Sequence, residues 1–80
     1  MSYAITWGPA ALQTFYDLPM HSAFILDRAV IRFATTGEGQ LEWVAPHHRL
    51  RAGVHDLVLH VDRDARTIDV LFVYRARHRA

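Results

Sequence analysis

The spacing of apolar residues in the first half of the chain predicts one strand and two helices. Residues 3–7 are rich in β-branched and aromatic side chains, as short strands are, and Gly8-Pro9 breaks that strand. Apolar residues recur at helical spacing over residues 9–18, and Pro19 ends this first helix. A second apolar stripe predicts a helix over residues 21–35, which a glycine-rich turn ends. We therefore expect a helical hairpin.

The second half alternates with a period of two residues, which predicts three antiparallel strands. In residues 47–51 the alternation places His47, Arg49 and Arg51 on one face of the first strand. Residues 40–46 stay undecided, because Leu41 and Trp43 suit a strand while Pro46 interrupts any ladder except at an edge or bulge. The order of elements predicts an α+β domain, β-α-α-β-β-β, with both helices on one face of a small antiparallel sheet.

The last strand, residues 67–75, is apolar on both faces. Strict alternation places Phe72 and Tyr74 on one face together with Ile68 and Val70, and leaves Leu71 and Val73 on the other. Two interpretations stay open. Phe72 and Tyr74 form an exposed patch for a protein partner or a second copy of the chain, or the helices cover them and they belong to the core.

Composition narrows the class of protein. The 80 residues are expected to form a single domain, residues 1–80, without cysteine and without an apolar run of the roughly 18 residues that span a bilayer. We expect an unprocessed cytoplasmic protein. His47 and His48 project to opposite faces of a strand and no third ligand stands at a fixed spacing, so a metal site is not expected. We expect no cofactor.

Charge is informative through its distribution. The net charge is only +1, yet every basic residue is arginine and most arginines and histidines lie in the second half. This pattern indicates either a local anion site or arginine-favouring codon usage. Residues 62–66 are rich in turn-forming residues and predict a hairpin loop. We expect the acidic side chains around it to form ion pairs with the loop arginines; the acidic residues are Asp62, Asp64 and Asp69, and the arginines are Arg63 and Arg66. His60 is expected to be solvated or to contact a neighbouring strand.

Three segments follow one another as LRAG, VLHVD and DARTIDVL, in the order and spacing of the last strands of RelE/ParE-superfamily toxins, which the chain resembles over nearly its whole length. The matching positions are Tyr3, Ile5, Trp7, Leu18, Pro19, Leu50, Arg51, Gly53, Val61, Asp62, Arg66, Thr67, Val70, Leu71 and Val73. The resemblance implies the toxin of a type II toxin–antitoxin system, neutralised by an antitoxin protein. RelE-like members cut mRNA in the ribosomal A site, and ParE-like members act on DNA gyrase.

Carried over residue by residue, the resemblance implies a metal-independent endoribonuclease site. A Lys-x-Lys pair of some ribonuclease members matches His47 and Arg49, so His47 is the candidate base, with Arg49, Arg51 and Arg75 stabilising the charged phosphate. Further candidate RNA-binding residues are Arg77, His78 and Arg79, which with Arg75 can supply charge from a shifted register, and His55. His55 or His78 is the candidate replacement for the family's acid.

Three departures oppose simple retention of that mechanism. Asp56 stands where the family commonly has arginine, Ala76 falls in a common His-Arg pair, and Ala80 aligns with a terminal tyrosine. Three functions therefore stay open: a nuclease acting on ribosome-bound mRNA, a non-catalytic ParE-like toxin that binds a protein target, and a domesticated interaction or regulatory module. Phe72 and Tyr74 are the candidate residues for the antitoxin or a homodimer.

Overall fold

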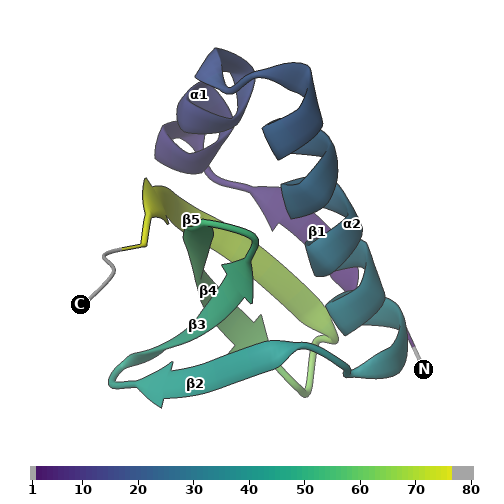
Figure 1. Cartoon of the computed structure of the whole chain (residues 1–80). Helices are drawn as coiled ribbons and strands as arrows, with labels where there is room; N and C mark the ends of the chain where they lie inside the picture. Colours follow the sequence, from purple (N-terminus) through teal and green to yellow (C-terminus); the bar gives the residue numbers. More distant parts are fainter. Residues whose placement is uncertain (1, 77–80) are drawn as a thin grey trace.

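Two helices lie on one face of a five-stranded sheet (Figure 1). The structure, a computed structural model, describes residues 2–76. Its elements are β1 (Ala4–Trp7), α1 (Pro9–Asp17), α2 (Met20–Thr36), β2 (Gln40–Val44), β3 (His47–Ala52), β4 (His55–Asp62) and β5 (Thr67–Arg75). Neither helix of the described residues is long and apolar enough to cross a membrane. The expected α+β class, with the helical hairpin on one sheet face, is confirmed.

The sheet differs from the expected one in two ways. Its strand order is β1-β5-β4-β3-β2, and β1 pairs parallel to β5, so the sheet is mixed rather than purely antiparallel. Residues 40–44 form a complete edge strand, β2, which pairs antiparallel with β3. Pro46 does not interrupt this ladder, because it lies in the turn between β2 and β3, after a cis peptide bond to Ala45.

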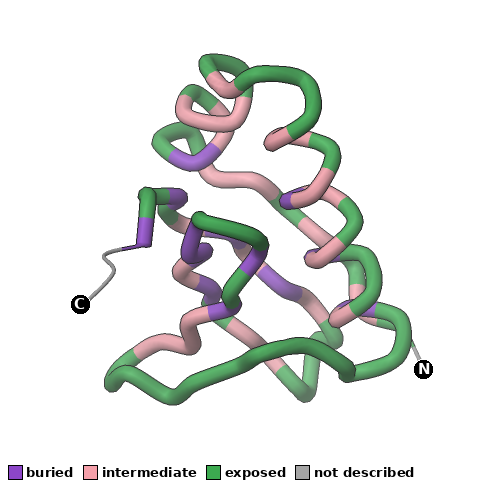
Figure 2. Tube along the Cα trace, in the orientation of Figure 1, coloured by how far each residue is buried: buried purple, intermediate pink, exposed green. Residues whose placement is uncertain are grey.

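The core lies between the helices and the sheet (Figure 2). From α2, Leu26 and Val30 are fully buried at helical spacing. The sheet contributes the fully buried side chains of Leu50, Leu57, Leu59, Ile68 and Val70. Burying each such side chain stabilises the fold by about 1.5–3 kcal/mol. The helices therefore define a covered face of the sheet and leave the opposite face, called here the open face, to solvent.

A β-bulge in β5 changes the faces of its side chains. Val58 pairs with Phe72, but the next residue of β4, Leu59, pairs with Val70, so Leu71 is the extra residue. One extra residue inverts the alternation beyond it. The expectation that Phe72 and Tyr74 share a face with Val70 is therefore wrong. Both lie on the open face, where their side chains are 54% and 41% exposed.

A two-residue turn sets the register of β3 against β4. Ala52 pairs with His55, and Gly53 between them has a φ of 64°. This left-handed conformation is strained for residues with a Cβ atom, and it suits the tight turns that join antiparallel strands. The turn places Arg51 directly opposite Asp56.

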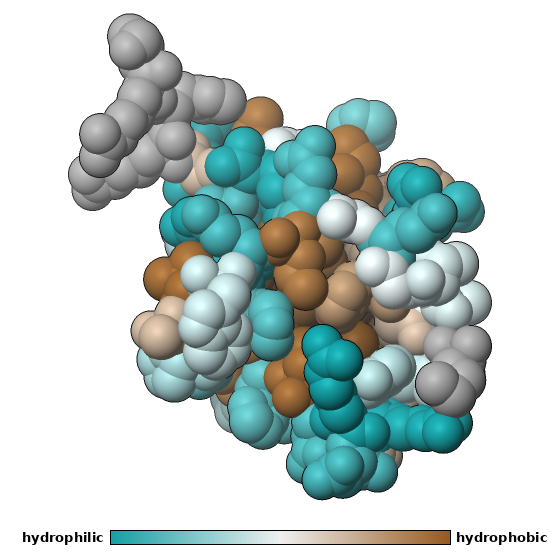
Figure 3. Space-filling model, turned by 90° about the horizontal axis from the view of Figure 1, so that it is seen from below, coloured by the Kyte–Doolittle hydropathy of each residue, from teal (hydrophilic) through white to brown (hydrophobic). Residues whose placement is uncertain are grey.

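Where β2 extends beyond the helices, a hollow of about 390 Å³ opens. Its apolar lining comes from the end of α2, from β2 and from the β4–β5 hairpin, and includes Phe33, Leu41, Val61 and Ile68. Viewed from below, apolar side chains gather there between hydrophilic ones (Figure 3). The core is thus less completely covered at this end of the molecule.

Candidate functional site

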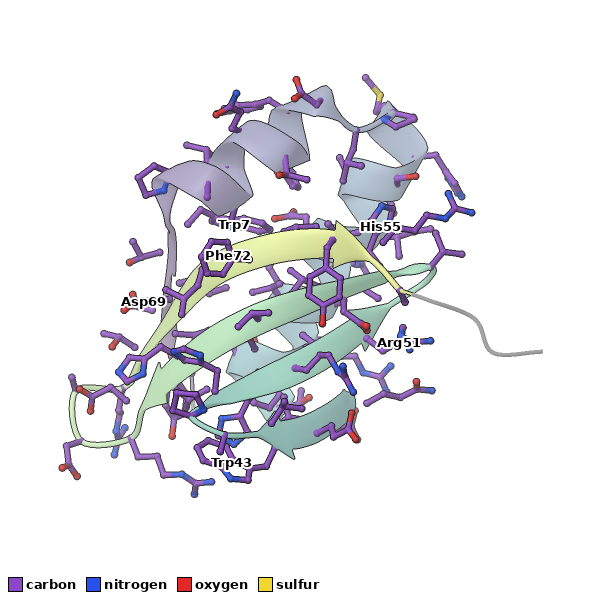
Figure 4. All side chains as sticks on the ribbon, turned by 90° about the vertical axis from the view of Figure 1, so that its left-hand side faces the viewer. Trp7, Trp43, Arg51, His55, Asp69 and Phe72 are labelled. Atoms are coloured by element: carbon purple, nitrogen blue, oxygen red, sulfur yellow. The ribbon has the colours of Figure 1, made fainter. Side chains whose placement is uncertain are left out.

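The open face carries three rows of side chains across neighbouring strands (Figure 4). The pairing registers align them because residues two apart on a strand share a face. The first row is Gln40, Arg51, Asp56 and Tyr74; the second is Glu42, Arg49, Val58 and Phe72; the third is Val44, His47, His60 and Asp69. Arginines, imidazoles and aromatic rings therefore meet on one accessible surface.

Arg51 is paired with Asp56 across the β3–β4 hairpin. The Arg51 Nε atom donates a hydrogen bond of 2.7 Å to Oδ1 of Asp56, whose side chain is only 5% exposed. From the sequence alone, the carboxylate of Asp56 is expected to repel a bound phosphate. In the structure that carboxylate is buried and neutralised by Arg51, so neither residue of the pair is a free charge.

Arg49 is held between two partners from different strands. Its Nη2 atom donates a hydrogen bond to Oε1 of Glu42 on β2. The pKa of the Arg49 guanidinium is raised above its usual range, first by hydrogen bonding with the Tyr74 side chain and then by Glu42. Arg49 is thus a permanent cation, and Glu42 offsets part of its charge.

A hollow of about 230 Å³ opens beside this arginine, at the end of the β2–β3 hairpin. Its lining includes His47, Arg49, Val58 and Tyr74 together with the turn residues. An imidazole, a guanidinium and a phenol therefore border one space, which we call the imidazole hollow. A second hollow, of about 240 Å³, is lined by the two ion pairs, and its residues are Gln40, Leu41, Glu42, Arg49, Arg51 and Asp56.

The structure brings together only part of the residue set selected from sequence. His47, Arg49 and Arg51 share the open face. Arg75 pairs in register with His55, and alternation along β5 places it on the opposite side from Tyr74. His55 is itself buried, with 9% of its surface exposed. Arg75 and His55 thus do not line the imidazole hollow, and Arg77, His78 and Arg79 lie outside the described residues.

Two contacts of Arg49 were not predicted from the sequence, because the pairing registers of β2 and β5 were not known. Glu42 lies on the undecided strand, and Tyr74 reaches Arg49 only because of the bulge at Leu71. His60 was expected to be solvated or cross-strand, and it is both: it is exposed and its ring centroid lies 6.5 Å from that of His47. His48 lies on the other face, with its ring against Trp43 at 4.8 Å.

The hairpin loop has a simpler structure than expected. Asp62 Oδ1 accepts a hydrogen bond of 2.9 Å from the backbone N–H of Ala65. Among residues 2–76 the ion pairs are Arg32–Glu38, Arg49–Glu42 and Arg51–Asp56. The expected pairing of the loop aspartates with Arg63 and Arg66 is therefore wrong, because a turn-forming hydrogen bond engages Asp62 instead.

Solved structures of known toxins share this architecture. RelE in the RelE–RelB complex of Pyrococcus horikoshii aligns with a TM-score of 0.78 over 100% of both chains, at 15% identity. The isolated RelE toxin of E. coli aligns with a TM-score of 0.78 over 98% of this chain and 88% of its own, at 14% identity. The YoeB dimer of Staphylococcus aureus aligns with a TM-score of 0.71 over 99% and 100%, at 16% identity.

Sequence comparisons alone do not identify the chain: no protein-family model matches it, and no curated protein matches it. The structural likeness extends over nearly the whole chain, at identities that support a common fold. The fold that the resemblance implied is therefore confirmed. The chain has the fold of the RelE-like toxins.

Proposed function

We propose that this chain is the toxin of a toxin–antitoxin system and that it inhibits translation by cutting ribosome-associated mRNA in the cytoplasm. The observation that carries the proposal is the imidazole hollow, where His47, Arg49 and Tyr74 meet on an uncovered sheet face. The shared fold with RelE and YoeB supports it. Two of these toxins were solved in complex with an antitoxin, which favours an antitoxin partner for this chain also.

The side chains of the hollow suit cleavage by the ribose 2′-hydroxyl. That reaction needs a base for the hydroxyl proton and positive charge near the phosphorane. His47 is the base in this proposal. A guanidinium has five N–H donors, so Arg49 retains donors for phosphate after it binds Glu42. Tyr74 offers an aromatic face on which an RNA base can stack.

The antitoxin has a natural target in the same region. Phe72 and Tyr74 are large exposed aromatic side chains on neighbouring rows of the open face. A partner that covers them buries apolar surface and closes the imidazole hollow at the same time. Neutralisation then follows from occlusion, without any change in the toxin fold.

Mutation of His47 tests the catalytic assignment. Primer extension on a translated message should detect cuts with the wild-type chain, and His47→Ala should lower cleavage by about 10²-fold or more because the base is lost. Arg49→Ala should lower it by a similar factor through the lost charge. His21→Ala, an exposed histidine on α2, serves as the control. Undiminished cutting by His47→Ala removes His47 from the mechanism.

A second function has one specific observation in its favour. Carboxylates neutralise both central arginines of the open face, Arg49 through Glu42 and Arg51 through Asp56. A toxin that binds a protein target such as gyrase, or a regulatory module, needs no free phosphate clamp. Growth arrest that persists in His47→Ala, without mRNA cuts, selects the protein-binding toxin; a supercoiling assay then tests gyrase. Absence of growth arrest in the wild type selects the module.

A further inference from the structure

His60 has a position on the open face that the proposed function has not used. It lies on β4 beside His47 of β3, one step beyond the paired residues His48 and Leu59. The two rings are 6.5 Å apart between centroids, with an interplanar angle of 84°. His60 is exposed, whereas His47 is half-buried against the hollow. Two imidazoles thus border one accessible stretch of surface.

We propose that His60 is the general acid of RNA cleavage and acts opposite His47, the general base. The assignment rests on the proposed nuclease function and names a second catalytic group for it. Cleavage by the 2′-oxygen needs two proton transfers, one at the attacking oxygen and one at the departing 5′-oxygen. The open face supplies an imidazole for each transfer.

The distance between the rings fits an in-line displacement. As the reaction begins, the attacking oxygen lies about 3–3.5 Å from phosphorus, and the departing oxygen is bonded to phosphorus on the opposite side. Each of the two oxygens forms a hydrogen bond of about 2.8 Å with a nitrogen of one imidazole ring, and the two hydrogen bonds are not collinear. Rings separated by roughly 6–8 Å therefore flank one phosphate, and the observed 6.5 Å falls in that interval.

The neighbours of the two rings assign their roles. Asp69 on β5 lies directly across from His60, so a carboxylate is available to the protonated ring on that side. Asp62, two residues further along β4, is already engaged by the Ala65 N–H. His47 lines the imidazole hollow beside Arg49, where the proposed function places the base. The acid role thus falls to His60.

The step balances in atoms and charge. Neutral His47 removes the proton of the 2′-hydroxyl while the 2′-oxygen forms a bond to phosphorus. The bond between phosphorus and the 5′-oxygen breaks, and protonated His60 gives its proton to that oxygen. The products are a 2′,3′-cyclic phosphate and a 5′-hydroxyl end. Solvent then returns each histidine to its starting protonation state.

A substrate with a 5′-bridging sulfur separates the two roles, because a thiolate leaves without a proton. The probe is an mRNA with one such linkage in the A-site codon of a programmed ribosome, compared with the all-oxygen message. On the all-oxygen message, His60→Gln and His47→Gln should each be slower than wild type by about 10²-fold or more. On the sulfur message, His60→Gln should return to within a few-fold of wild type, and His47→Gln should stay slow.

His21→Gln is the matched histidine control and should cut both messages at the wild-type rate. Thermal unfolding followed by circular dichroism checks that each variant is folded; His60→Ala replaces His60→Gln if the latter is not. Wild-type cleavage of the all-oxygen message by the His60 variant overturns the acid assignment while the nuclease proposal stands. Rescue of His47→Gln instead of His60→Gln also overturns it. Failure of the wild type to cut either message overturns both proposals.

Discussion

Arg51 and Asp56 illustrate how a single contact changes the meaning of a residue. Taken alone, an aspartate among phosphate-binding positions opposes anion binding. Opposite Arg51, with 5% of its side chain exposed, it forms the most buried ion pair of the described residues. Sequence predicted the shared face of His47, Arg49 and Arg51, because β3 has no irregularity. It could not predict the Asp56 contact without the hairpin register.

Removing the Asp56 charge should destabilise the fold. Asp56→Asn weakens a charge-assisted hydrogen bond, and Arg51, 39% exposed, recovers part of the loss from water. We expect the free energy of unfolding to fall by about 1–2 kcal/mol in urea denaturation. Glu38→Gln breaks the exposed Arg32–Glu38 pair and should cost less than about 1 kcal/mol. Equal losses in the two variants contradict the importance of burial.

The alternation of apolar and polar residues predicted the side-chain faces of some strands and not of others. Alternation placed β3 and β4 well because their ladder is regular between His48 and Ala52. It failed in β5 beyond Val70, since a bulge leaves no period-two signature. It left β2 undecided because Pro46 follows the strand closely, and the five exposed residues of this edge strand have no burial pattern to outweigh the proline. An alternating sequence pattern arises when one face of a strand is buried, and neither face of β2 is buried.

The β3–β4 turn gives a prediction for these two elements. Gly53→Ala forces a Cβ atom into a φ of 64°, so the variant should lose about 1 kcal/mol of unfolding free energy. Space is not the limiting factor, because the added Cβ meets Ile25 Cγ2 at an ordinary 3.4 Å. Val54→Ala changes the adjacent turn residue, which has no positive φ, and should be close to neutral. Urea denaturation compares the two, and a neutral Gly53→Ala contradicts the strained turn.

At the scale of the whole molecule, the net charge is nearly balanced, and the central charges of the open face are balanced locally. The net charge is +1, and the two central arginines of the open face each meet a carboxylate from a neighbouring strand. Long-range attraction to RNA is therefore weak in the free protein. Under the proposed nuclease function, RNA recognition would therefore depend on close contacts in the imidazole hollow.

Neutralising both carboxylates should make RNA binding more sensitive to salt. In Glu42→Gln/Asp56→Asn, two arginines become available to phosphate, so the slope of log K against log salt should steepen by about 0.7 per added contact. Fluorescence anisotropy of a single-stranded RNA over a range of KCl concentrations measures this slope. Asp17→Asn/Asp64→Asn makes the same change in net charge at two exposed sites. An equal slope in both double variants attributes the effect to net charge alone.

The extra residue at Leu71 constrains how this protein can vary. Because Val70 and Phe72 pair with adjacent residues of β4, loss of Leu71 alone would leave a regular ladder with Phe72 and Tyr74 still on the open face, so this single-residue deletion is compatible with the fold. Loss of Leu71 together with Phe72 would instead turn Val73 outward and Tyr74 inward. Any comparison with relatives therefore has to allow a one-residue offset at this point before it matches aromatic positions near the chain end.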